Sequence, residues 1–216
     1  MQVALKQVVV PPGQQLLLKD VSWQMYEGIL KELGEKRAAR INYFQGILEI
    51  MTPLPGHEVG KVIIGDLVKA LCEEIEVECW SLGSTTFKNK DMAAGIEAED
   101  CFYIQNEAVI RGKDIVDLNT DPPPDLAIEI DIASRTRLDN YEALGVPELW
   151  RYDGQNLEIN VLENGKYVSS NISRNFPNFP LVDVIPQYVE QSKIQGRNAT
   201  IRAFRSWVKE VTGKLS

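Results

Sequence analysis

The hydrophobic positions of this chain recur at helical spacing in four places. Trp23, Tyr26, Ile29, Leu30 and Leu33 form one apolar stripe, and Ser22 precedes it as a helix cap. The same spacing predicts three further helices: a longer one over 57–75, a short one over 138–144, and a last one that opens at Asn198 or Thr200. Gly145 follows the short helix, as a C-terminal cap often does.

Between these helices the polar and apolar residues alternate as strands do. The segment 40–51 predicts two strands that turn at Gln45 and Gly46. Other strand-like runs are 77–82, 85–87, 101–104, 125–132, 149–152, 157–162 and 167–169. Hairpin turns are indicated at Asp153-Gly154 and Asn164-Gly165. The order of elements predicts an α/β or α+β fold with a mixed sheet.

The segment 125–132 (DLAIEIDI) is the most informative stretch of the chain. One face of this strand is apolar, and the other carries Asp125, Ala127, Glu129 and Asp131. Three carboxylates on one face of a central strand repel one another, so a divalent metal or basic side chains must balance them. The alternative is an edge strand whose polar face lies in water. Asp125, directly after three prolines, could equally be a turn residue.

Further candidates lie outside this strand. Glu97 and Glu99 share a face as the chain enters the run 101–104, and they could complete a metal site or simply belong to a polar loop. Glu49 lies in the predicted hairpin. His57, the sole histidine, starts a helix, where a polar residue without any ligand role is more common.

The composition restricts the class of protein. The chain has 216 residues, 44% hydrophobic and 25% charged, which is typical of one globular domain. Its three cysteines form no C-x-x-C pair, and neither a membrane span nor a leader is indicated, so we expect a cytoplasmic protein without a membrane partner. The formal charge of −8 means that nucleic-acid binding needs a local basic patch or metal ions. The last predicted helix offers one such patch in Arg202, Arg205 and Lys209.

Five motifs in order resemble a known family. They are 44–53 (FQGILEIMTP), His57, 95–104 (GIEAEDCFYI), 124–129 (PDLAIE) and 141–150 (YEALGVPELW). Together they resemble the Uma-two type of endonucleases, within the PD-(D/E)xK restriction-endonuclease-like superfamily, over about 21–189. The resemblance implies a single α/β domain with a mixed sheet flanked by helices, and a metal-dependent phosphodiesterase site.

The resemblance also implies roles for particular residues. Glu99 and Glu129 match the acidic positions that hold Mg²⁺ or Mn²⁺, and Glu49 and His57 match positions beside the site. Asp131, on the same strand face as Glu129, could hold a water ligand or a second ion. Arg137 stands where the family usually has lysine, and Glu99 where it usually has aspartate. Arginine can stabilise a phosphate in the transition state, but it cannot act as a base.

These departures leave two hypotheses open. The first is a metal-dependent endonuclease acting on nucleic acid, DNA being the expected partner, with a possible homodimer. The second is a nuclease fold whose site has drifted and which now serves as a binding module. A glycosidase with paired carboxylates finds no support in a sugar-binding motif. For either hypothesis we expect an N-terminal extension over 1–20, the nuclease-like domain over 21–190, and a C-terminal amphipathic helix within 191–216 that packs on it.

Overall fold

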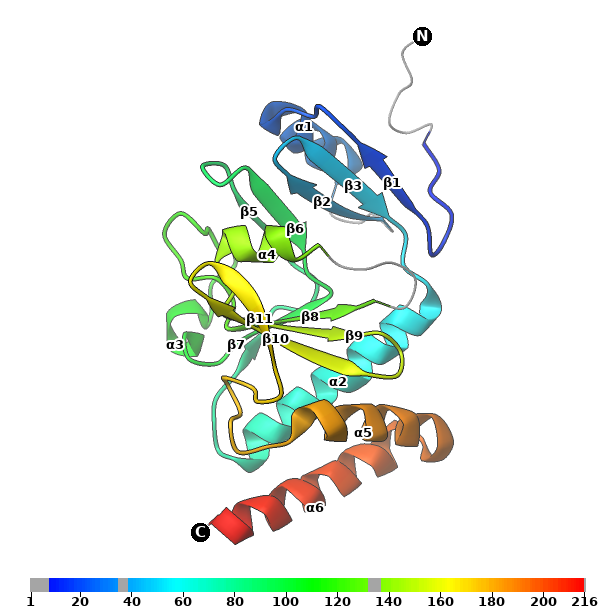
Figure 1. Cartoon of the computed structure of the whole chain (residues 1–216), viewed down its shortest axis with the longest axis vertical. Helices are drawn as coiled ribbons and strands as arrows, with labels where there is room; N and C mark the ends of the chain where they lie inside the picture. Colours follow the sequence, from blue (N-terminus) through cyan, green and yellow to red (C-terminus); the bar gives the residue numbers. More distant parts are fainter. Residues whose placement is uncertain (1–7, 35–38, 132–136, 216) are drawn as a thin grey trace.

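The computed structural model describes residues 8–34, 39–131 and 137–215, without the side chains of His57 and Leu215. Two β-sheets lie beside a layer of long helices (Figure 1). In chain order the elements are β1 (Gln15–Leu18), α1 (Trp23–Leu33), β2 (Arg40–Phe44), β3 (Ile47–Met51), α2 (Pro55–Glu74), β4 (Trp80–Ser81), β5 (Thr86–Asn89), β6 (Ala94–Glu97), β7 (Asp100–Tyr103), α3 (Glu107–Ile110), β8 (Leu126–Ile130), α4 (Leu138–Leu144), β9 (Glu148–Tyr152), β10 (Leu157–Glu163), β11 (Lys166–Ser170), α5 (Leu181–Gln195) and α6 (Arg197–Leu215).

The larger sheet is mixed and has the strand order β11-β10-β9-β8-β7-β4. β8 and β9 run parallel, whereas the other neighbours in this sheet are antiparallel. Helix α4 lies in the connection from β8 to β9, as a parallel pair requires. β8 is therefore an interior strand, and all five of its residues are buried. The alternative of an edge strand with a hydrated polar face is wrong.

The smaller sheet is antiparallel and has the order β1-β3-β2-β6-β5. Its central hairpin turns at Gln45 and Gly46, which have φ of 45° and 86°, the left-handed values that a two-residue turn needs. One face of the hairpin packs on α1 through Ile41, Tyr43, Leu48 and Ile50. By alternation, Arg40, Asn42 and Glu49 lie on the opposite face.

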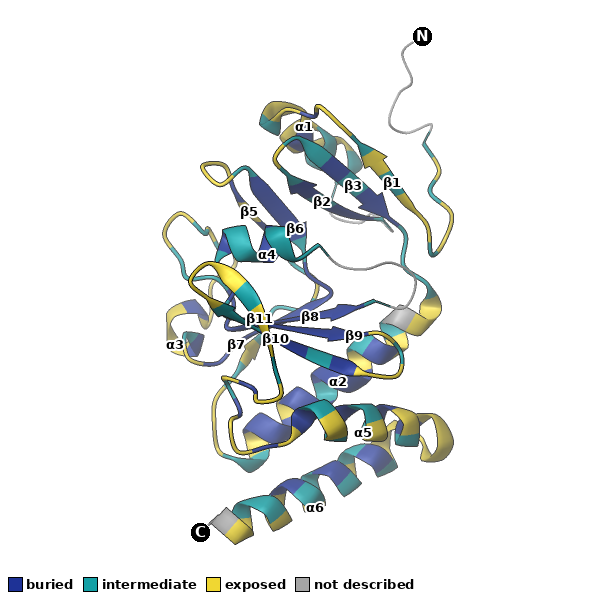
Figure 2. Ribbon diagram, viewed as in Figure 1, coloured by how far each residue is buried: buried dark blue, intermediate teal, exposed yellow. Residues whose placement is uncertain are grey.

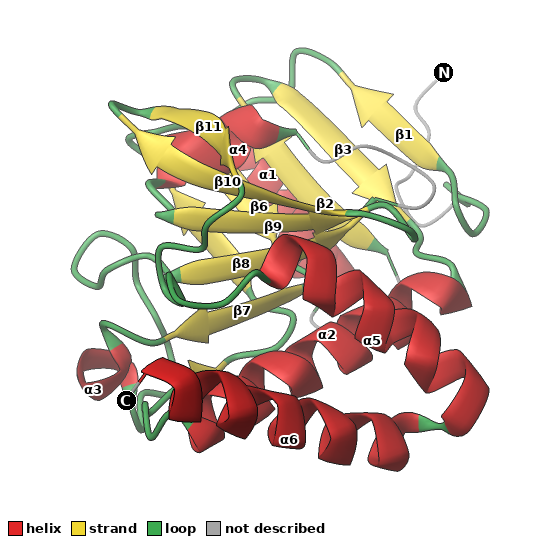
Figure 3. Ribbon diagram, turned by 60° about the horizontal axis from the view of Figure 1, so that its bottom comes forward, coloured by secondary structure: helices red, strands yellow, loops and turns green. Residues whose placement is uncertain are grey.

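The long helices cover one face of the larger sheet, as Figure 3 shows. Leu126, Ile128 and Ile130 of β8 belong to an apolar core that also contains residues of α2, α5 and α6. Figure 2 shows β8 and β9 buried within this arrangement. Helix α2 comes close to β7 at Gly65, where a Cβ would lie 2.5 Å from Oδ2 of Asp100. The other face of the larger sheet shares a second core with β5, β6 and α4.

Most predicted elements are present. Ser22 caps α1 by accepting a hydrogen bond from the Met25 amide at 3.2 Å, and α4 ends at Gly145 in the left-handed conformation. The α/β class is confirmed, but the strands divide into two sheets rather than one. None of the helices in the described ranges is long and apolar enough to cross a bilayer.

The sequence did not predict β1, β6, α3 or α5. Helix α5 contains Pro186, which removes a backbone donor and usually interrupts a helical pattern. β1 lies within the segment expected as an extension, and it pairs with β3. The predicted boundary at residue 191 lies within α5, and α6 follows it after Gly196.

Candidate functional site

Two buried carboxylates face each other on neighbouring strands of the larger sheet. The register pairs Asp100 with Ile128, and one further step places Glu99 opposite Glu129. Glu99 is 0% exposed and Glu129 only 7%. Burial, and next the charge of Glu99, raise the pKa of Glu129 well above its usual value. The two acids that the sequence singled out are therefore brought together, in surroundings that disfavour two negative charges.

Arg40 supplies a positive charge to this pair. It lies at the start of β2, is 6% exposed, and forms an ion pair with Glu99. Its Nη2 also donates to Oε1 of Glu58, in the first turn of α2, at 3.2 Å. Burial alone would lower the pKa of Arg40, but the charges of Glu99, Glu129 and Glu58 outweigh it and raise the pKa. Arg40 thus stays protonated and joins the smaller sheet to the carboxylates.

Tyr141 of α4 fixes the second carboxylate. Its hydroxyl donates a hydrogen bond to Oε1 of Glu129. Burial, together with the neighbouring charge of Glu129, raises the pKa of Tyr141 well above its usual value. The phenol therefore remains a donor, and it orients the Glu129 side chain.

Glu49 and Arg137 form a second group. Glu49 lies opposite Asn42 in the hairpin. Burial raises the pKa of Glu49, although a hydrogen bond from Asn42 and the charge of Arg137 act against the shift. Arg137 itself binds Asp139, with Nη2 at 2.8 Å from Oδ2 and Nε at 3.3 Å from Oδ1. Arg137 is thus held near Glu49 by a partner on α4.

Asp131 follows β8 and lies near a different arginine. Its Oδ2 is 3.8 Å from Nη1 of Arg151, which also pairs with Glu158. These side chains line an open cavity of about 380 Å³. The charge of Asp131 also contributes to the raised pKa of Glu129, so the two acids interact. Asp131 therefore lines an open cavity and interacts electrostatically with Glu129.

Two other candidate residues are Asp125 and His57. Asp125 accepts hydrogen bonds from the amides of Ile104 and Asn106, at 2.7 and 3.0 Å, and so holds the segment that follows β7. These partners are about 20 residues away in the chain, so Asp125 acts here as a long-range acceptor. His57 falls in the first turn of α2, but its side chain lies outside the described residues.

The sequence matches one family over most of its length. The match extends over residues 23–194, to the family Uma2, which is described as "Putative restriction endonuclease". The chain belongs to the Uma2 family. The resemblance drawn from the five motifs is confirmed.

Comparisons with solved structures and with curated proteins give less information. One similar solved structure is that of a "putative nuclease belonging to DUF820" from Anabaena variabilis ATCC 29413. It is 15% identical, with 83% of this chain and 96% of that chain covered, at a TM-score of 0.46. No curated protein matches this Uma2 chain.

The Uma2 motifs do not name every residue at the site. Arg40 and Tyr141 contact the predicted acids and Glu58 contacts Arg40, yet the sequence motifs give none of them a functional role. One signal was available for Arg40, because it shares a face of its strand with Asn42 and lies opposite the apolar face. Tyr141 shares a side of its helix with Leu138 and Leu144, so its spacing indicates packing and gives no sign of the hydrogen bond to Glu129.

Restriction-endonuclease-like families generally use divalent metals. Glu99 and Glu129 provide the hard oxygen ligands that Mg²⁺ and Mn²⁺ prefer. In the part of the chain that the structure describes, no group of three or more Asp, Glu, His or Cys residues is arranged to hold a metal. Mg²⁺ often binds through one or two carboxylates, with water and phosphate completing its shell, so this pair fits such an ion. An ion there would compete with Arg40 for Glu99.

The basic face proposed on the last helix is mostly used inside the molecule. Arg205 of α6 pairs with Glu73 and with Glu74, the latter at 2.9 Å, and Lys209 lies 3.3 Å from Glu74. Both glutamates belong to α2. The expected phosphate-binding patch is therefore largely a contact that holds α6 against α2.

Proposed function

We propose that this Uma2 protein is a metal-dependent endonuclease that hydrolyses phosphodiester bonds, with DNA as its substrate. The observation that carries the proposal is the buried Glu99–Glu129 pair on adjacent strands, with Arg40 against it. A purely structural core gains nothing from two facing carboxylates whose charge a buried arginine must balance. A site that must hold a cation and bind a phosphate does gain from such an arrangement.

Glu99 and Glu129 would hold Mg²⁺ or Mn²⁺, and Asp131 would hold a water ligand or a second ion. The ion would polarise the phosphate and lower the pKa of a bound water. Tyr141 keeps the Glu129 carboxylate in a fixed orientation through its hydrogen bond. This orientation is what the bound ion would require of its ligand.

Two arginines would carry the phosphate charge. Arg40 carries a planar fork of donors that would bind a phosphate oxygen next to Glu99. Arg137 can stabilise the charge that develops in the transition state, but it stays protonated and cannot accept a proton. We assign proton transfer to Glu49, whose pKa burial raises, with His57 as the alternative acceptor.

Cleavage assays test the proposal directly. Supercoiled plasmid and single-stranded DNA are incubated with wild type, Glu129→Gln and the exposed-carboxylate control Glu163→Gln, each with Mg²⁺, with Mn²⁺ or with EDTA. We expect metal-dependent cleavage by wild type and by the control, and a loss of about 100-fold or more in Glu129→Gln. Equal cleavage by Glu129→Gln would refute the assigned site.

A binding measurement separates the endonuclease from the binding-module alternative. Mn²⁺ should raise the melting temperature of wild type, because a ligand that binds only the folded state stabilises it. This shift should disappear in Glu129→Gln and persist in Glu163→Gln. A folded wild type that shows neither cleavage nor a metal-dependent shift would favour the drifted module. Size-exclusion chromatography with and without DNA would test the expected homodimer.

A further inference from the structure

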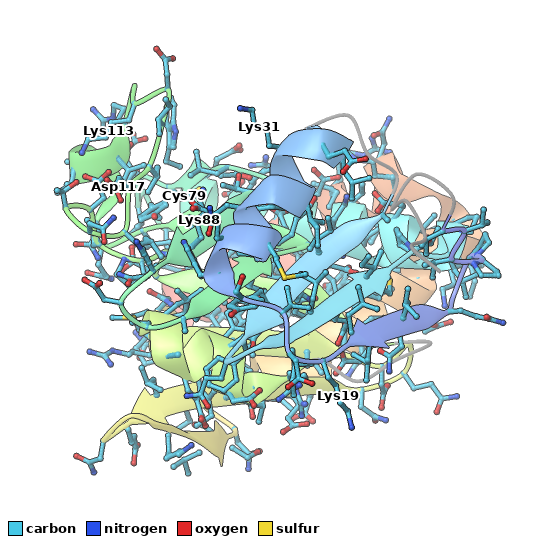
Figure 4. The ribbon with its side chains drawn as sticks, turned by 90° about the horizontal axis from the view of Figure 1, so that it is seen from above. Lys19, Lys31, Cys79, Lys88, Lys113 and Asp117 are labelled. Atoms are coloured by element: carbon cyan, nitrogen blue, oxygen red, sulfur yellow. The ribbon has the colours of Figure 1, made fainter. Side chains whose placement is uncertain are left out.

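Two cysteines lie together at the C-terminal end of α2. Cys72 is buried in the last turns of the helix, and Cys79 is partly exposed just before β4. The chain reverses between them, with the Val77 amide donating to the Cys72 carbonyl at 2.9 Å. Both cysteines line the same open cavity, and Cys79 is labelled in Figure 4. Along the helix axis Cys72 is about 21 Å from Glu58, at 1.5 Å per residue, so this pair is separate from the carboxylate site.

The surroundings give the two thiols different characters. The hydrogen bond from Cys72 lowers the pKa of Cys79; burial opposes this shift, and the charge of Lys69 adds to it. The same hydrogen bond, together with burial, raises the pKa of Cys72. Cys79 is partly exposed and has the lowered pKa, so an oxidant in the cavity reaches its thiolate first, whereas Cys72 is buried in the wall of the same cavity. This is the arrangement of an attacking and a resolving cysteine.

We propose that Cys79 and Cys72 form a redox-active pair that a small neutral hydroperoxide converts to an intramolecular disulfide. The Cys79 thiolate attacks the O–O bond, which breaks to give a sulfenic acid at Cys79 and one alcohol or water. Cys72 then attacks the Cys79 sulfur, the S–S bond forms, and the sulfenic hydroxyl leaves as water. Two thiols lose two hydrogens in total, and one hydroperoxide is reduced.

The cavity beside the pair determines the class of oxidant. It has a volume of about 580 Å³ and is open to solvent, with Cys72, Cys79 and Ser81 among its lining residues. One lysine, Lys69, faces three glutamates at positions 73, 76 and 78 in this lining. An anionic oxidant such as glutathione disulfide is repelled by this excess of negative charge, whereas hydrogen peroxide is not.

The third cysteine is a control within the same chain. Cys101 is buried, and its Sγ lies 3.4 Å from the Gly83 carbonyl as a donor. Burial, and next the charge of Asp100, raise the pKa of Cys101. It should remain reduced while the pair oxidises.

The experiment uses the reduced full-length protein treated with hydrogen peroxide, then blocked with iodoacetamide in denaturant and digested with trypsin. Cleavage after Lys69 and Lys88 leaves both cysteines in the single peptide 70–88. We expect this peptide to lose two hydrogens and to escape alkylation, and the free thiols to fall from three to one per chain. Cys101 should react at least about tenfold more slowly.

Three variants test the order of the steps. In Cys72→Ser, dimedone should capture a sulfenic acid at Cys79. In Cys79→Ser, Cys72 should stay unmodified, and in Cys101→Ser the disulfide should still form. The proposal is overturned if peptide 70–88 is alkylated at both cysteines after treatment, if wild type forms disulfide-linked dimers instead, or if glutathione disulfide oxidises the pair as fast as peroxide.

Discussion

Two arginines of this chain each bind a pair of glutamates, in opposite surroundings. Arg40 contacts Glu99 and Glu58 between the two sheets, and its side chain is 6% exposed. Arg205 contacts Glu73 and Glu74 between α6 and α2, and its side chain is 33% exposed. The ion-pair chemistry is the same, and the difference is access to water.

This difference indicates which of the two charge clusters belongs to a functional site. Around Arg205, water and salt screen the charges. Its ion pairs therefore contribute little to the free energy of unfolding, and their loss is easily tolerated. Around Arg40, the Glu99 and Glu129 carboxylates have left water although Glu58 has not, and the buried groups depend on their partners. Two buried acids lower the stability of the fold, whereas apolar residues at the same positions would not. Their presence is therefore a reason to expect a catalytic or binding role.

The largest expected effect comes from removing the buried cation. Arg40→Met keeps most of the side-chain volume but leaves Glu99 and Glu129 without their balancing charge. We expect the free energy of unfolding to fall by about 3–5 kcal/mol, as for other broken buried ion pairs. Urea denaturation followed by circular dichroism measures the change.

A double variant shows whether charge is the cause. Replacing Glu99 by Gln in the Arg40→Met background removes the uncompensated carboxylate. This variant should regain at least half of the lost stability, since neighbouring substitutions of this kind are not additive. A double variant no more stable than Arg40→Met would indicate lost packing instead. Should Arg40→Met fail to fold, recovery of folded protein in the double variant makes the same point.

A smaller effect is expected when the charge at residue 40 is kept and only its shape changes. Arg40→Lys retains a cation near Glu99, but one ammonium cannot reach Glu58 and Glu99 in the way that the planar fork does. The loss should be about 1–3 kcal/mol, the size of hydrogen bonds to charged groups. Comparison of Arg40→Lys and Arg40→Met by the same denaturation assay separates shape from charge. Equal losses would mean that the fork geometry, rather than the charge, holds the site together.

The fold was largely predictable because its signals are local. The Ser22 cap, the turn at Gln45-Gly46 and the Gly145 terminus each depend on neighbours within a few residues. β6 is four residues long and contains Gly95, so it carries little strand pattern. The division into two sheets depends on pairings between distant segments, which no local pattern encodes.

Of the residues at the candidate site, only the acidic ones could be predicted from the sequence. Alternation along β8 placed Glu129 opposite an apolar face, and the family motif added Glu99. Arg40 lies 59 positions before Glu99 in the chain, and the pairing of β2 with β6 brings them together, because its register leads Arg40 to the residue beside Glu99. The basic residues of α6 looked like a binding face because their partners on α2 could not be seen from spacing alone.

The smallest effect should come from the exposed counterpart. Arg205→Met removes the contacts to Glu73 and Glu74, and we expect a loss of only about 0.2–1 kcal/mol, because Glu73 returns to water and Glu74 keeps Lys209 as a partner. The hydrogen bond that Arg205 donates lowers the pKa of Glu74, so this contribution is present at neutral pH and is lost as the pH falls below the usual pKa of a glutamate and through the lowered one. Denaturation in low salt and in molar NaCl gives the matched measurement: the difference between wild type and Arg205→Met should vanish in high salt, while that for Arg40→Met should persist. A loss of stability in Arg205→Met that is insensitive to salt and as large as that in Arg40→Met would mean that burial does not distinguish the two groups of ion pairs. The buried charge would then no longer support the carboxylate site.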